Sequence, residues 1–174
     1  MPEVLVGMSL SLLLASGVYT VYETCQASYW RTASRSSMNQ AARTGLEQLR
    51  RELRLAGSDP SATGQAAVQT LGGSAVEFIA DVDDDNVSDL VRYERDAGTR
   101  SIRRTVRRWT GTAWGPAQAA TVADGVQSLT FQYFPAAAVP GLKRIRVRVE
   151  LSASGLIIGS LQHAVTTDIQ LRNL

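Results

Sequence analysis

The chain has 174 residues, of which 44% are hydrophobic and 20% charged, and its formal net charge is +2. This length fits one ordinary domain and leaves no room for a second domain of enzyme size. The small positive charge does not by itself indicate nucleic-acid binding. Cys25 is the only cysteine, which excludes an intramolecular disulfide, a thiolate zinc site and a CxxC redox pair.

The chain begins with a long apolar segment. No charged residue stands between Val4 and Tyr22, and this run comes close to the ~20 residues that a helix needs to cross the hydrocarbon of a bilayer. An acidic residue, Glu3, precedes the segment, and helical sequence follows it without a break. A cleaved secretory signal would have a basic start and a shorter apolar run. We therefore expect a membrane-spanning helix.

Glu3 puts a carboxylate at the head of this segment, where it is costly in lipid unless it is paired or hydrated. Two interpretations fit it. The carboxylate needs a partner inside an apolar assembly, or it lies at the level of the lipid headgroups, where the helix N-terminus favours a negative charge. The residues alone do not separate the two.

Beyond the apolar segment, apolar residues recur at spacings of three and four, the pattern of a helix with one buried face. This stripe consists of Met38, Ala42, Leu46, Leu49, Leu53 and Ala56. One helix is therefore expected from about residue 2 to Ala56, with Gly57 as its stop. Residues 1–27 are expected to protrude, and residues 28–174 to form a globular domain.

After Gly57 the chain reads as short strands separated by turn residues. The candidates are Ala75–Ala80, Leu90–Arg95, Arg100–Trp109, Val126–Phe134, Arg144–Leu151 and Val165–Leu171. In Arg144–Leu151 apolar and charged residues alternate, as in a half-buried antiparallel strand. The apolar face of such a sheet needs a cover, and the helical stripe can supply it. The expected fold class is α+β, with a long N-terminal helix packed on an antiparallel β-sheet.

An acidic segment between two of these strands has the spacing of a calcium-binding loop. Asp81, Asp83, Asp85 and Asp89 stand at positions 1, 3, 5 and 9, and Val87 offers a backbone carbonyl at position 7. Asn86 replaces the usual glycine but tolerates the left-handed conformation. Arg92 stands at position 12, where a bidentate glutamate is needed. A calcium site and a solvated acidic turn both stay open.

The densest basic segment follows. Its members include Arg103, Arg104, Arg107 and Arg108. On a strand, Arg104 and Arg108 point to the opposite face from the other two, so the charge is divided between two surfaces. A solvated edge strand that resists aggregation explains these residues better than nucleic-acid binding does.

The sequence contains no set of nucleophile, base and orienting residue. His163 is the only imidazole and stands among small and apolar residues, which favours a structural role. Neither a GxSxG motif nor a Walker-type phosphate loop occurs. We expect a protein that is not an enzyme and requires no cofactor, with calcium as the one ligand left open.

The start of the chain, Met1-Pro2-Glu3-Val4-Leu5-Val6-Gly7-Met8, resembles that of type IV pilins and type II secretion pseudopilins. The segments 81–93, 123–134 and 168–174 are also similar to the PilW-type minor pilins and the J-type pseudopilins of this family. The resemblance aligns Glu3 with the family's glutamate and puts two residues before Met1. It implies that Glu3 neutralises the N-terminal amine of a neighbouring subunit and so fixes the register of a filament.

The resemblance further implies a minor or tip subunit of a pilus, held in the inner membrane by a single span and later part of an extracellular or periplasmic filament. Its implied partners are other pilin-like subunits, the inner-membrane assembly machinery, a prepilin peptidase and, before assembly, membrane lipid. A type II secretion pseudopilus fits equally well. The alternative is a single-pass anchored β-domain that binds a ligand without polymerising.

Overall fold

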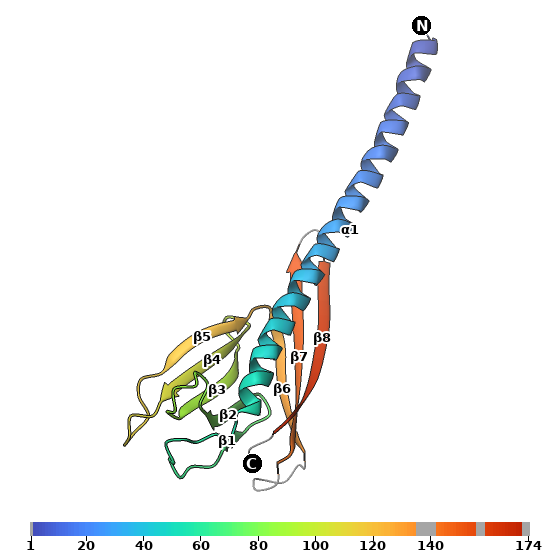
Figure 1. The fold of residues 1–174 in the computed structure, drawn as a ribbon. Coiled ribbons are helices and arrows are strands. Elements are labelled where there is room, and N and C mark those ends of the chain that lie inside the picture. Colours follow the sequence, from blue (N-terminus) through green and yellow to red (C-terminus); the bar gives the residue numbers. More distant parts are fainter. Residues whose placement is uncertain (1, 135–141, 156–158, 172–174) are drawn as a thin grey trace.

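The structure is a computed structural model that describes residues 2–134, 142–155 and 159–171, without the side chains of residues 38, 70, 71, 153–155 and 159–161. This part of the chain contains one helix and eight strands. The helix, α1 (Pro2–Arg54), has 53 residues, which corresponds to roughly 80 Å. Its N-terminal half extends away from the body as a single rod, and its C-terminal half lies across the strands (Figure 1).

The packed half of α1 follows the expected stripe. Ala42 is the first fully buried side chain among the described ones, and Leu46, Leu49, Leu53 and Ala56 are buried after it. The side chain of Met38 lies outside the described residues. The sequence pattern therefore identified the face of the helix that meets the sheets.

The helix ends at Arg54, two residues before the expected position. Gly57 adopts a left-handed conformation with φ of 90°, and its N–H donates a hydrogen bond of 2.9 Å to the carbonyl of Ile79. The chain thus leaves the helical path early because Gly57 is tied to a strand, while Ala56 stays in the core.

The strands form two antiparallel sheets rather than one. The larger sheet has the order β1 (Val68–Leu71), β2 (Ala75–Ala80), β3 (Asp89–Asp96), β4 (Ser101–Arg108) and β5 (Gln118–Ala123). The smaller sheet has the order β6 (Val126–Phe134), β7 (Arg144–Gly155) and β8 (Gly159–Gln170). Each strand pairs with its neighbours in the chain, so both sheets are simple meanders.

Strand β6 joins the two sheets. The N–H of Phe131 donates to the carbonyl of Gly73 at 2.9 Å, and the N–H of Val126 donates to the carbonyl of Arg100 at 2.7 Å. The core fills the space between α1 and both sheets and contains Leu49, Leu53, Phe78, Tyr93, Ile145 and Val147. The expected α+β class is confirmed.

Candidate functional site

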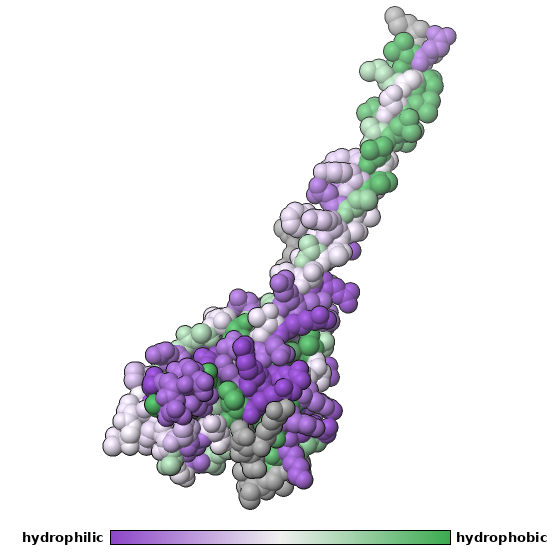
Figure 2. All heavy atoms as spheres, viewed as in Figure 1, coloured by the Kyte–Doolittle hydropathy of each residue, from purple (hydrophilic) through white to green (hydrophobic). Residues whose placement is uncertain are grey.

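The N-terminal half of α1 carries the largest apolar surface outside the core. Figure 2 shows this surface along the rod, well away from the polar body. Leu12 and Leu13 are each 71% exposed. By length and composition the helix can cross a membrane, and the protein body buries none of its most apolar stretch. An apolar patch of this extent needs lipid or protein around it.

Several hydroxyl side chains of this half form hydrogen bonds within the helix. The hydroxyls of Ser9, Ser11 and Thr20 each donate to the carbonyl four residues earlier, at 2.8, 2.9 and 2.9 Å. An apolar environment offers no water to satisfy such groups, so internal hydrogen bonds are required there. The segment is therefore suited to lipid or to a packed helical core in spite of its serines and threonines.

The two ends of the apolar segment differ. Glu3 is exposed in the first turn of α1, at the end farthest from the body, and no ion pair of the described residues involves it. Beyond the other end, Tyr29 and Trp30 are exposed and meet edge to face with their ring centroids 5.9 Å apart. Both interpretations of Glu3 stay open.

The acidic segment forms the turn between β2 and β3. The carboxylates of Asp81, Asp83 and Asp85 offer oxygens that all lie within 4.8 Å of one another. Asp81 accepts hydrogen bonds from the N–H groups of Asp85 and Asn86, at 3.2 and 3.0 Å. Asn86 has φ of 60°, the left-handed conformation expected where an asparagine replaces glycine.

A guanidinium already lies against this turn. Arg108 contacts the carboxylate of Asp85 and lies 3.9 Å from that of Asp83. The N–H of Val87 donates to Asp85 at 2.9 Å. Arg108 therefore neutralises two of the carboxylates that a calcium ion would use, and an ion would have to displace it.

Asp89 lies outside the cluster of three aspartates. It is the first residue of β3 and only 3% exposed. Burial raises the pKa of Asp89 to about 6, and the charge of Asp83 adds to this, while the N–H of Val82 and the guanidinium of Arg104 act in the opposite direction. Among the described residues, the structure thus groups three of the four expected aspartates and leaves the fourth buried beside them.

The basic segment does not lie on an edge strand. Strand β4 pairs with β3 on one side and with β5 on the other, so the expectation of an edge strand is wrong. Arg103 and Arg107 are exposed, whereas Arg104 reaches the helix and Arg108 the acidic turn. Two of the four arginines, Arg104 and Arg108, thus form ion pairs with carboxylates of the same chain.

The partner of Arg104 is Glu52, which is only 7% exposed. One carboxylate oxygen of Glu52 accepts from Arg104 Nε and from the hydroxyl of Tyr93, each at 2.9 Å, and the other accepts from Gln48 at 3.1 Å. Burial raises the pKa of Tyr93, and the adjacent Glu52 raises it further, so the phenol stays a hydrogen-bond donor. Burial acts to lower the pKa of Arg104, but the hydrogen bonds and charge interactions with Glu52 and Tyr93 together outweigh it and the pKa is raised.

This network was missed by the sequence analysis, although a signal was present. Glu52 stands three residues after Leu49 and four before Ala56, which places it on the buried stripe of α1. Tyr93 and Arg104 come from adjacent strands in direct register. The arrangement fastens the helix to the middle of the larger sheet.

No family model, no curated protein and no solved structure matches this chain. The geometry of the described residues gives two candidates for a functional site. One is the exposed apolar half of α1 with Glu3 at its tip, and the other is the acidic turn closed by Arg108.

Proposed function

We propose that the chain is a minor or tip subunit of a type IV pilus-like filament. Before assembly, Val4–Tyr22 anchors it in a membrane, and after assembly the same segment packs among the helices of other subunits. The observation that carries the proposal is the division of one continuous helix into an exposed apolar half and a half buried under its own sheets.

The energetics favour an assembly role. Each exposed leucine or valine of the rod gains about 1.5–3 kcal/mol when it is transferred from water to apolar surroundings. Lipid and a bundle of identical helices both provide such surroundings, so transfer from one to the other costs little. Glu3 adds a requirement for pairing with a neighbour, because a carboxylate in a helix bundle is stable only beside a positive group such as the amine of a neighbouring subunit.

A single-pass anchored module is the second candidate. Tyr29 and Trp30, followed by Arg31 and Arg35, form the belt of aromatic and basic residues that holds a helix at a membrane interface. In that role the rod stays in lipid and never meets another copy. A type II secretion pseudopilus shares the filament mechanism and differs only in its partners.

Cys25 provides the test, because it is the only cysteine, it is exposed and it lies three residues beyond Tyr22. A membrane-impermeant maleimide should label Cys25 in the membrane fraction. In sheared polymers, neighbouring helices should protect the same thiol until the polymers are dissolved in detergent. Recovery of the chain in the membrane fraction alone, with Cys25 labelled there, would support the anchored module instead.

A further inference from the structure

Strand β8 is the outer strand of the smaller sheet and pairs only with β7 in the described part of the chain. The pairing runs through 12 residue pairs without a register shift. Its single charged residue, Asp168, is held by Arg146 in two hydrogen bonds of 2.7 and 3.0 Å. A long, regular edge strand without proline, lysine or a bulge is a ready template for another strand.

The other sheet edges among the described strands are short, irregular or covered. Strand β1 has 4 residues and a register shift. Strand β5 has 6 residues and also a register shift. The outer side of β6 is covered, because its Phe131 and Val126 N–H groups donate to Gly73 and Arg100, which lie in the β1–β2 and β3–β4 connections of the larger sheet. Strand β8 thus lacks the protective features that the other edges have.

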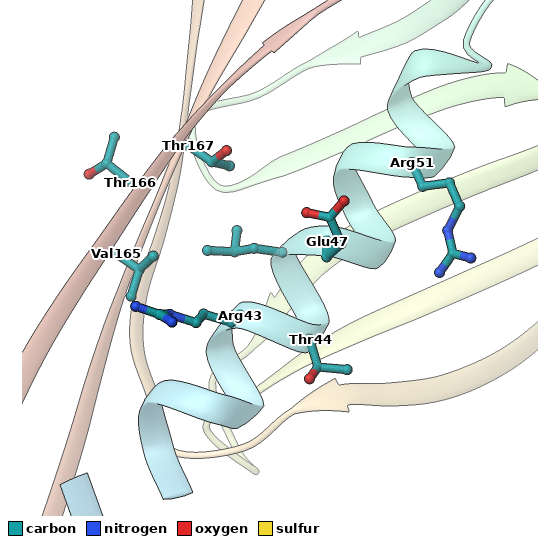
Figure 3. A pocket seen from close by; sticks show the side chains of 8 residues that line it. Arg43, Thr44, Glu47, Arg51, Val165, Thr166 and Thr167 are labelled. Atoms are coloured by element: carbon teal, nitrogen blue, oxygen red, sulfur yellow. The ribbon is translucent and has the colours of Figure 1, made fainter. Parts of the chain in front are cut away.

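A groove of about 570 Å³ lies between α1 and β8, with Val165, Thr166 and Thr167 on one side and Arg43, Glu47 and Arg51 on the other. We call it the α1–β8 groove. In Figure 3, Arg43 reaches from the helix toward Val165, Thr167 points toward the helix and Thr166 points away from it. Because consecutive residues of β8 line the groove, it reaches the edge of the strand and not only one face.

The helical wall of the groove is positively charged. Glu47 pairs with Arg50 at 3.7 Å, while Arg43 and Arg51 are exposed and take part in no ion pair of the described residues. These two arginines are eight residues apart on α1, which is roughly 12 Å along the axis. Eight residues also turn the helix by about 80°, and in Figure 3 Arg43 points toward β8 whereas Arg51 points away from it. Arg43 is therefore the arginine that faces β8.

We propose that the α1–β8 groove binds an extended acidic segment of a partner protein. The segment adds a fourth strand to the smaller sheet along the free edge of β8, and one of its carboxylates pairs with Arg43. Backbone hydrogen bonds supply affinity and the charges supply specificity, as in other cases of strand addition. The inference goes beyond the proposed filament and holds whether or not the chain polymerises.

The test uses the full chain in detergent micelles and a labelled peptide of about ten residues, alternating threonine and valine, with one aspartate near its middle. Fluorescence anisotropy should show binding of this peptide and not of its lysine counterpart. The variant Arg43→Glu should bind the acidic peptide roughly tenfold more weakly and should now bind the lysine peptide. The matched control Arg107→Glu makes the same charge change at an exposed position of the larger sheet and should bind like the parent.

Two N-methylated forms of the acidic peptide separate strand addition from simple charge attraction. A strand paired along one edge uses every second N–H group, so methylation of one alternating set should abolish binding and methylation of the other set should not. Equal binding of both forms, or an unchanged affinity in the Arg43→Glu variant, would overturn the proposal. A dimer of the chain that the peptide dissociates would identify a second copy as the occupant and would overturn the assignment to a partner.

Discussion

Glu52, Tyr93 and Arg104 form a buried polar group between α1 and the larger sheet. Burial of a charge is tolerated only when it is paired and its hydrogen bonds are made. Here one helix and two neighbouring strands each supply a member, so the network can form in only one register of helix on sheet. We interpret it as the contact that fixes how α1 lies across the larger sheet.

Glu52→Leu leaves the guanidinium of Arg104 and the hydroxyl of Tyr93 without their acceptor. We expect the free energy of unfolding to fall by about 3 kcal/mol, because removal of one partner of a buried pair exposes the cost of burying the other. Chemical denaturation of the detergent-solubilised chain measures this. Glu47→Leu, which removes a surface carboxylate paired with Arg50 at 3.7 Å, is the matched control and should change stability by less than about 0.5 kcal/mol. Equal stability of the two variants would refute the role of Glu52.

Asp89 should make stability depend on pH. Its folded-state pKa of about 6 lies above the ordinary value of 3.8, so the folded state favours the protonated form. The stability that the folded state gains from protonated Asp89 is fully present below about pH 4 and is lost as the pH rises through 6. Asp89→Asn should therefore match the parent at pH 4 and exceed it by about 1–3 kcal/mol at pH 8.

Thermal unfolding of Asp89→Asn and of the parent at the two pH values measures this difference in stability. Asp124→Asn, at an exposed carboxylate, serves as the control and should follow the parent at both. A constant difference between Asp89→Asn and the parent across this range would show that Asp89 does not titrate near pH 6.

The acidic turn yields a calcium prediction in which Arg108 is the competitor. If the carboxylates of Asp81, Asp83 and Asp85 bind calcium, Arg108→Ala should strengthen binding, because the ion no longer has to displace a guanidinium. Millimolar calcium should then raise the melting temperature of Arg108→Ala more than that of the parent. The double variant Asp83→Asn, Asp85→Asn should lose the response. Calorimetry that detects no calcium binding to Arg108→Ala would leave only the solvated turn.

Strands were predictable where the alternation of residues is strong. Strands β2 and β6 begin and end at the expected residues, and β3 and β4 differ from expectation by one residue at each end. Strands β1 and β5 were not predicted. The first has four residues, and the second, Gln118–Ala123, contains three alanines and one glutamine, which have weak strand propensity.

The ends of β7 and β8 were also missed. Both strands continue through residues such as Ser152, Gly155 and Gly159, which on their own favour turns. Their pairing with each other holds them in extended form. The sequence therefore predicts the part of each strand that lacks residues favouring turns, and tertiary pairing determines the rest. The α1–β8 groove depends on that pairing and could not be found from the sequence.

The two halves of α1 should respond differently to a polar substitution. Leu53 is 0% exposed and Leu12 is 71% exposed. Leu53→Asp buries an unpaired charge, so we expect a loss of several kcal/mol from a total stability of roughly 5–15 kcal/mol, with unfolding of the body. Leu12→Asn should leave the melting temperature of the body unchanged and weaken membrane retention. Denaturation and membrane flotation measure the two effects, and a Leu53→Asp variant as stable as its parent would contradict the packing described here.

The whole molecule combines a compact α+β body with a rod that cannot be stable in water on its own. The body buries its half of α1, whereas no residue that the structure describes covers the apolar half (Figure 2). A membrane and a bundle of like helices are the two environments that match this rod. Glu3 at its tip distinguishes them, since a carboxylate tolerates a hydrated headgroup region without a partner but needs one in a helix bundle.

The most direct measurement follows the chain through the membrane and sheared-polymer fractions of its own cells, for the parent and for Glu3→Gln. We predict that the parent occurs in both fractions and that Glu3→Gln occurs in the membrane alone, because it keeps the apolar span and loses the charge that selects a neighbour. Glu23→Gln, at the other end of the apolar segment, is the control and should occur in both fractions. Recovery of Glu3→Gln in polymers at the parent's level, or absence of the parent from polymers, would contradict assembly through this helix.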